Sequence, residues 1–232
     1  YGAEKQEDGR VVCEIALWNK LVDSGKQLYC AVRQLEKATE AKNNGNSEIA
    51  TFYLQLAEQE QVLGEHYKKA VQRFYNVFST YEVAESARAR DRLSNAADLL
   101  DKATEAKSQG NPEIVTLYLQ LAEQEQALAE HHRKAAIDCL EKNVANAALD
   151  KAAKSAEASG DRLCRVACKL DEATEAKSQG NLEIATLLQF TEQEQASSLE
   201  YLKAAQAYAE GNNEEGDQLF QAAEEVAKGK SY

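Results

Sequence analysis

A 29-residue stretch of this chain occurs three times, and this repetition most constrains what the chain can fold into. Leu100–Leu128 reads LDKATEAKSQGNPEIVTLYLQLAEQEQAL. A near-identical stretch lies earlier in the chain, at Leu35–Leu63, and another lies later, at Leu170–Gln195, with one residue deleted. A degenerate fourth copy occupies 203–229. Self-similarity at a fixed period indicates a repeat architecture, so we expect a row of similar structural units.

The middle of each copy predicts a tight turn between two helices. Gly110 suits the left-handed position just past a helix end, Asn111 suits the N-cap of the next helix, and Pro112 suits its first turn. The helix after the turn is expected to run from Pro112 to about Asn143, some 48 Å at 1.5 Å per residue. The fold class predicted is all-α: an array of antiparallel helical hairpins on an internal repeat of about 65–70 residues, either a helical repeat or an elongated bundle.

The repeat also sets the expected domain organisation. We expect a flexible N-terminus at 1–9 and a single helical-repeat domain at 10–232. Gly25 and Gly160 are expected to end helices, because glycine is a poor helix former. The predicted repeat copies are 26–90, 91–160, 161–203 and the degenerate copy 203–229.

Polar residues recur within the apolar stripe of the second helices. A buried polar side chain must find a hydrogen-bond partner, so these residues are expected to bond between neighbouring helices and fix their register. The predicted register residues are Gln59, His66, Gln124, His131 and Gln193.

The residues around the turn resemble tetratricopeptide repeats. Ala103 stands where that family has a small residue in its first helix, and Val115, Leu119 and Ala122 stand at the small, aromatic and small positions of its second helix. The last copy is similar at Ala204, Gly211, Phe220 and Ala223. The repeat in this chain is about twice as long as the family's period of about 34. The resemblance implies a curved helical array that binds peptides or proteins.

Composition excludes several classes of function. The net charge of −12 and the absence of a basic run argue against nucleic acid as a partner. No stretch approaches the roughly 20 consecutive apolar residues of a membrane span. The sequence leaves the compartment open between the cytoplasm and secretion after removal of an N-terminal signal.

Carboxylates and imidazoles in the second helices raise the alternative of a metal-binding helical bundle. Ferritin-like bundles hold two metal ions with Glu-x-x-His motifs, and that spacing is absent here. If a metal binds, its ligands are expected to be Glu125, Glu130 and His131. Cys164 and Cys168 are expected to pack as small buried apolar side chains. We expect no cofactor.

The repeated Ala-Thr-Glu-Ala-Lys segment forms a candidate binding surface. Its identity between copies has two explanations, a conserved contact surface or recent duplication, and the sequence leaves both open. The candidate surface residues are Thr39, Glu40, Lys42, Thr104, Glu105, Lys107, Thr174, Glu175 and Lys177.

The sequence contains no nucleophile motif and no glycine-rich phosphate loop, so we expect no enzyme activity. The predicted function is a non-enzymatic protein–protein interaction or scaffold module. The alternatives are the metal-binding bundle and a secreted surface or effector protein that acts through self-pairing helices. The expected partner is another protein or a second copy of the chain.

Overall fold

The structure is a computed structural model of the chain, and it describes the backbone of residues 2–73, 80–142, 147–178 and 184–228. Side chains are described for residues 19–69, 83–138, 151–175 and 190–228.

The described residues form seven α-helices and no strand, which confirms the all-α class. The helices are α1 (Gly2–Asn43), α2 (Ser47–Arg73), α3 (Thr80–Ser108), α4 (Pro112–Lys142), α5 (Ala147–Ser178), α6 (Ile184–Ala209) and α7 (Asn213–Ala227).

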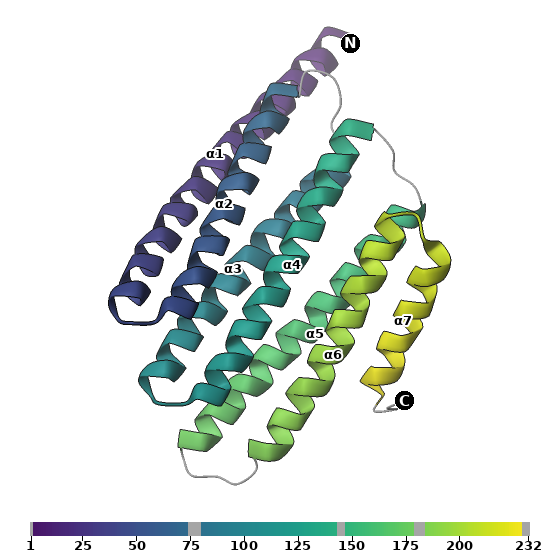
Figure 1. Cartoon of the computed structure of the whole chain (residues 1–232). Coiled ribbons are helices and arrows are strands. Elements are labelled where there is room, and N and C mark those ends of the chain that lie inside the picture. The colour runs from purple at the N-terminus through teal and green to yellow at the C-terminus, as the bar shows by residue number, and fades with distance from the viewer. Residues whose placement is uncertain (1, 74–79, 143–146, 179–183, 229–232) are drawn as a thin grey trace.

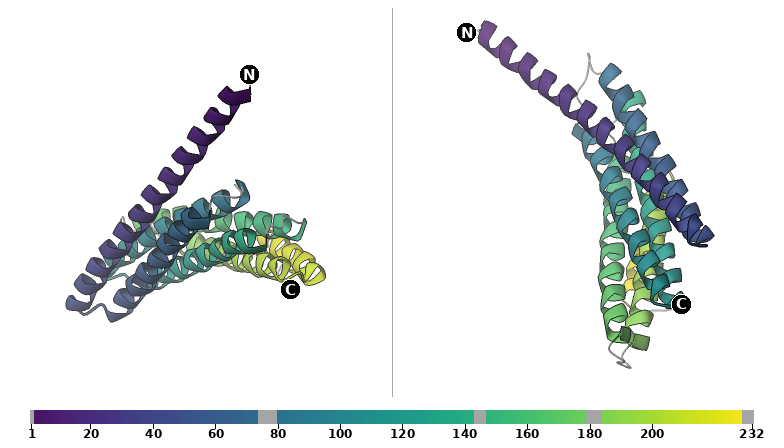
Figure 2. Two further views of the ribbon diagram at one scale, coloured as in Figure 1. Left: turned by 90° about the horizontal axis from the view of Figure 1, so that it is seen from above. Right: turned by 90° about the vertical axis from the view of Figure 1, so that its left-hand side faces the viewer.

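The helices pair in chain order into antiparallel hairpins. The pairs α1–α2, α3–α4 and α5–α6 have the most extensive contacts, and α7 packs on α6 (Figure 1). Neighbouring hairpins meet mainly through α2 with α3 and α4, and through α4 with α5 and α6. The N-terminal part of α1 extends away from the other helices (Figure 2). The predicted array of helical hairpins is therefore confirmed.

Glycine in the left-handed region closes three of the turns. Gly45, Gly110 and Gly211 have φ angles of 76°, 73° and 87°. In each turn the amide of the following asparagine donates to a carbonyl five residues earlier, as in a Schellman motif. These bonds are Asn46 N to Ala41 O at 2.8 Å, Asn111 N to Ala106 O at 3.0 Å and Asn212 N to Ala207 O at 2.9 Å. The turn at 179–183 lies outside the described residues.

Two glycines expected to end helices lie inside them. α1 includes residues 2–9, assigned above to a flexible segment, and continues through Gly25. α5 continues through Gly160, and a side chain at that position would overlap the guanidinium of Arg92. Gly160 therefore serves packing between hairpins, and tertiary contacts outweigh its low helix propensity.

The core consists of leucines and isoleucines that recur at equivalent positions. Ile49, Leu56 and Leu63 of α2 are fully buried, and so are their counterparts in α4. Burying one such side chain stabilises the fold by about 1.5–3 kcal/mol. The repeated sequence thus builds the same core in the first and second hairpins.

Candidate functional site

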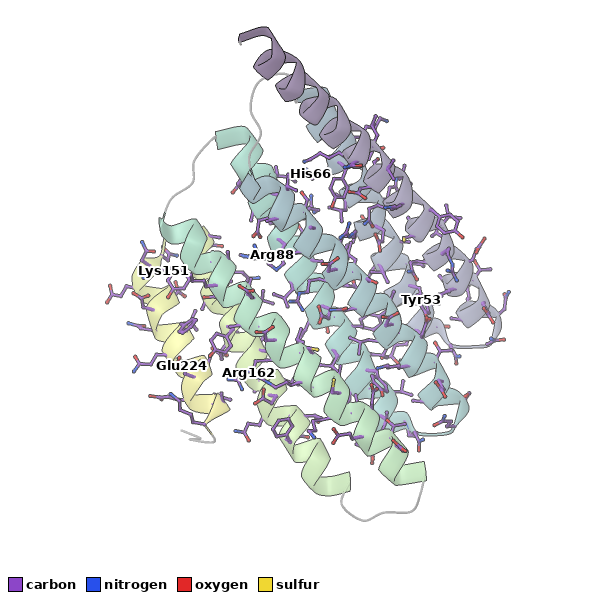
Figure 3. All side chains as sticks on the ribbon, turned by 180° about the vertical axis from the view of Figure 1, so that it is seen from behind. Tyr53, His66, Arg88, Lys151, Arg162 and Glu224 are labelled. Atoms are coloured by element: carbon purple, nitrogen blue, oxygen red, sulfur yellow. The ribbon has the colours of Figure 1, made fainter. Side chains whose placement is uncertain are left out.

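A carboxylate on α3 joins the second hairpin to the first. Asp101 accepts hydrogen bonds from Lys37 Nζ of α1 at 2.6 Å and from the hydroxyl of Tyr53 of α2 at 2.6 Å. The Lys37 ammonium lies 5.6 Å from the centre of the Tyr53 ring, within cation–π range. Burial and the hydrogen bond to Asp101 raise the pKa of Tyr53 well above its usual range, so the phenol remains a donor. Figure 3 shows Tyr53 and His66 toward opposite ends of α2.

The same contact recurs one hairpin later. Asp171 of α5 accepts hydrogen bonds from Lys102 Nζ of α3 at 2.6 Å and from the hydroxyl of Tyr118 of α4 at 2.8 Å. In both cases the preceding hairpin supplies the lysine and tyrosine, and the following hairpin supplies the aspartate. The contact therefore has a direction along the array.

A third contact of this kind attaches α7. Asp217 of α7 accepts hydrogen bonds from Lys151 of α5 at 2.7 Å and from the hydroxyl of Tyr208 of α6 at 2.6 Å. The hydrogen bonds from Lys151 and Tyr208 lower the pKa of Asp217. Gly216 leaves room for the Tyr208 ring, since an added side chain there would overlap it. α7 thus packs on the third hairpin through contacts with both α5 and α6.

The first hairpin has a carboxylate that could accept such a contact, but no lysine or tyrosine among the described residues donates to it. Glu36 of α1 stands one repeat before Asp101, at the equivalent position of the first copy. It is exposed and bonds to no residue within the described part of the chain.

The apolar residues beside Glu36 are also uncovered. Leu28 and Leu35 of α1 are 39% and 48% exposed. Their counterparts in α3, Leu93 and Leu100, are 2% and 0% exposed because the first hairpin covers them. Identical side chains are therefore buried or exposed according to whether a hairpin precedes them.

The same difference occurs on the second helices. Leu54 of α2 is 51% exposed, whereas its counterpart Leu119 of α4 is 3% exposed. Gln126 and Glu130 lie on the same stripe of α4 as Leu119, and both line a groove shared with α2. This stripe of α4 therefore faces the preceding hairpin. We define the open face of the first hairpin as Leu21, Leu28, Val32, Leu35, Glu36 and Leu54.

The second helix of each hairpin, α2, α4 or α6, carries a buried glutamate at an equivalent position, and the partners of these glutamates differ. Glu194 of α6 is paired with two arginines of α5, Arg162 at 2.7 Å and Arg165 at 3.2 Å. Figure 3 labels Arg162 on α5. The two guanidinium groups neutralise the buried carboxylate and satisfy its oxygens.

Glu125 of α4 is the equivalent residue in the second hairpin. Its carboxylate lies 3.5 Å from the guanidinium of Arg92 and 3.5 Å from the side-chain amide of Asn95, both on α3. Burial raises the pKa of Glu125 to about 7, although Arg92 and Asn95 oppose this shift.

Glu60 of α2, the third equivalent, has no cationic partner among the described residues. Gln27 stands at the position of Arg92, and Cys30 stands at the position of Asn95. Glu60 is 3% exposed, and burial raises its pKa to about 8. Burial raises the pKa of the Cys30 thiol, and the nearby carboxylate of Glu60 raises it further. The first hairpin thus contains a buried carboxylate without its arginine.

The predicted contact surface lies beside the contacts between hairpins. Thr39, Thr104 and Thr174 donate to the carbonyl four residues earlier in their own helices. The other surface residues are exposed where described, namely Glu40, Lys42, Glu105, Lys107 and Glu175, and the side chain of Lys177 lies outside the described residues. Adjacent alanines such as Ala38 and Ala103 are buried, so packing accounts for their repetition.

Two predicted register residues bond between helices. His66 Nε2 of α2 lies 3.2 Å from Ser86 Oγ of α3. Gln193 Nε2 of α6 donates to the carbonyl of Val226 of α7 at 2.9 Å.

The other three register residues have a different environment. The side-chain oxygens of Gln59 and Gln124 accept no hydrogen bond from the described residues. His131 is buried, and its Nε2 atom has no hydrogen-bond partner there either. Burial and the neighbouring charge of His132 lower the pKa of His131 to about 4. His131 is therefore neutral at physiological pH.

A buried hydrogen bond between α3 and α4 could not be predicted from the repeats. His132 Nδ1 lies 2.7 Å from Glu85 Oε2, and both residues are 0% exposed. Burial raises the pKa of Glu85, but His132 and Arg88 outweigh this effect and lower it. Glu85 lies in the spacer between copies, where the repeat gives no signal.

The three residues named as metal ligands do not converge. Glu125 pairs with Arg92, whereas Glu130 pairs with Arg133 at 2.6 Å. In the part of the chain that the structure describes, no group of three or more His, Cys, Asp or Glu side chains is arranged to hold a metal ion. Cys164 and Cys168 are exposed on α5, so the prediction of their burial is wrong.

The fold and this geometry define a class of protein, an array of antiparallel helical hairpins. Within the described residues, no helix has the length and apolar character needed to cross a membrane. The sequence matches no protein-family model, and no curated protein matches it significantly. Function is therefore inferred from the geometry of the chain.

Proposed function

We propose that this protein is a non-enzymatic interaction module that binds another protein through the open face of its first hairpin. The carrying observation is the exposure of Leu28 and Leu35, whose counterparts Leu93 and Leu100 are buried by a neighbouring hairpin. An apolar face of this kind is typical of a binding surface.

The covered counterparts indicate the chemistry of the partner. In the second and third hairpins, the equivalent faces are covered by α2 and α4, which are helices. We therefore infer a helical partner with an apolar stripe. A lysine or tyrosine beside that stripe would bond to Glu36, as Lys37 and Tyr53 bond to Asp101.

Burial of the open face is large enough to support binding. Complete burial of one leucine side chain contributes about 1.5–3 kcal/mol before the costs of association. Leu28, Leu35 and Leu54 are each half-exposed, so together they supply a hydrophobic centre for an interface.

Head-to-tail binding of a second copy is disfavoured by the position of α7. α7 already covers α6 and satisfies Lys151 and Tyr208 through Asp217. A second copy would have to displace α7 before it offered a surface like that of α2. Symmetric pairing of two open faces remains an outcome that the experiment distinguishes.

The test is site-specific photo-crosslinking in the native cell. A photoreactive amino acid at Leu35 is expected to give a crosslink to a protein other than this chain. The crosslink is expected to disappear when Leu28→Glu is also present and to persist with Leu199→Glu. Leu199 is the matched control, because it is 39% exposed like Leu28 but lies on α6.

Three outcomes contradict this proposal. The first is no crosslink from position 35, and the second is a crosslink that Leu28→Glu leaves unchanged. The third is a crosslink only to another copy of this chain, with a dimer in sedimentation equilibrium, which would establish self-association instead. Circular dichroism of each variant checks that the helices are intact.

A further inference from the structure

The first hairpin contains a cavity where the other hairpins contain a guanidinium group. The cavity has a volume of about 650 Å³ and lies between α1 and α3, with Glu60 of α2 in its wall. Gln27, which replaces the arginine, and Cys30 also line it. The missing arginine side chain therefore leaves an accessible space beside a buried carboxylate.

Three buried side chains that line this cavity each have an unpaired acceptor atom. These atoms are Glu60 Oε2, Gln27 Oε1 and Gln34 Oε1, and none accepts a hydrogen bond from the described residues. Glu60, Gln27 and Gln34 are 3%, 2% and 6% exposed. Burying a polar group without a partner is costly, so such a set is expected to have a donor in the occupied state.

We propose that this cavity binds a guanidinium group from outside the chain, which takes the place that Arg92 and Arg162 occupy beside Glu125 and Glu194. The ligand class is an alkylguanidine, either a free small molecule or the side chain of an arginine residue in a peptide. The site is separate from the open face, and its occupancy does not depend on the partner proposed there.

The chemistry of the wall fits this group. A guanidinium has five N–H donors and no acceptor, so it can donate to the unpaired oxygens of Glu60, Gln27 and Gln34. Its charge compensates the buried carboxylate of Glu60. Val22, Tyr29 and Ala97 also line the cavity and suit the alkyl stem of the ligand.

The two cations of the chain that line the cavity, Arg90 and Lys26, pair with aspartates. Arg90 of α3 lines the cavity, but its guanidinium lies 3.2 Å from Asp91 and 3.9 Å from Asp23. Lys26 also lines it and lies 3.4 Å from Asp23. An inward turn of Arg90 is the internal alternative, and the experiment includes a variant for it.

The experiment is calorimetric titration of the full chain with propylguanidinium and with its neutral isostere propylurea. The wild-type protein is expected to bind propylguanidinium and not propylurea. Glu60→Gln is expected to weaken binding at least about tenfold, as for loss of a charged hydrogen-bond partner. Gln27→Arg is expected to abolish binding, because the new side chain fills the site from within.

The control variant is Glu58→Gln, which removes an exposed carboxylate of α2 outside the cavity lining and is expected to leave binding unchanged. N-acetylargininamide and its neutral citrulline analogue distinguish the sources. Binding of N-acetylargininamide assigns the site to a peptide arginine, whereas binding of propylguanidinium alone assigns it to a free small molecule.

Two results would overturn the proposal. One is absence of propylguanidinium binding to the wild-type protein, including the case in which Arg90→Ala then gains binding, since Arg90 would be the internal partner. The other is equal binding to wild type and Glu60→Gln. Thermal melting of Gln27→Arg checks that this variant is folded.

Discussion

Leu35 and Leu100 occupy the same position in two copies of one sequence, yet Leu35 is 48% exposed and Leu100 is 0% exposed. The residue is identical, so the difference arises from the presence of a preceding hairpin. In a repeat array, the burial of a side chain depends on the neighbouring unit as well as on its own unit. The first hairpin consequently exposes a surface whose equivalent in the second hairpin is covered.

The buried glutamates differ for the opposite reason. Glu60 and Glu125 are both buried, but the first hairpin has Gln27 where the second has Arg92. Here the environment is similar and the residue has changed. One comparison concerns a missing neighbour and the other a missing side chain, and each can be altered by mutation.

Truncation of the two leucines gives the largest expected contrast. Leu100→Ala is expected to lower the free energy of unfolding by about 2–5 kcal/mol, because it leaves a cavity in the core. Leu35→Ala is expected to lower it by less than about 0.5 kcal/mol, as at an ordinary surface site. Urea unfolding followed by circular dichroism measures both. Equal losses would show that the open face is covered in solution.

Removing an arginine from the third hairpin reproduces the first hairpin, in which the buried glutamate lacks an arginine partner. Arg162→Gln is expected to destabilise the fold by roughly 2–3 kcal/mol, because Glu194 retains only Arg165 as a cationic partner. Lys169→Gln, which breaks an exposed pair with Glu172, is the control and is expected to cost less than about 1 kcal/mol. Similar losses in the two variants would mean that burial adds nothing to the Arg162 contact.

The pH dependence of stability tests the unpaired glutamate. The pKa of Glu60 is raised to about 8 in the folded state from an ordinary value of 4.5. The folded state thus keeps a proton that the unfolded chain releases, and stability falls as pH rises between these values. Relative to wild type, Glu60→Gln is expected to gain roughly 1–2 kcal/mol between about pH 6 and about pH 9.

Urea unfolding at each pH, without added amines or guanidine, measures this gain. Glu125 has a pKa raised to about 7 and contributes with the same sign in both proteins, so their difference isolates Glu60. An unchanged difference between wild type and Glu60→Gln across this range would mean that Glu60 already has a cationic partner.

Much of the fold follows from the repeated sequence. The Gly-Asn pairs predict the turns at Gly45, Gly110 and Gly211, and the apolar spacing predicts the helices on either side. Local propensity failed at Gly25 and Gly160, where it predicted helix ends. Gly160 packs against the side chain of Arg92 from another hairpin, which no local pattern contains.

The site was less accessible from sequence. The repeated segment identified the neighbourhood of the contacts between hairpins, but the exposure of Leu35 depends on what precedes it in space. A usable signal for the cavity was present. Asp91-Arg92-Leu93 and Asp161-Arg162-Leu163 align between copies, and extending that alignment to Lys26-Gln27-Leu28 shows the missing arginine. Its importance emerges only when Glu60 is found buried beside it.

The Lys–Asp–Tyr contacts also bear on how the gene changes length in evolution. In each contact the preceding hairpin supplies Lys and Tyr, and the following one supplies Asp, so every internal hairpin has a matching front and back. Loss of the second hairpin by recombination between copies would bring Lys37 and Tyr53 to Asp171 and recreate the contact. Descendants of this gene are therefore expected to vary in length by whole repeats, with the Lys–Asp–Tyr contact between hairpins retained after each gain or loss.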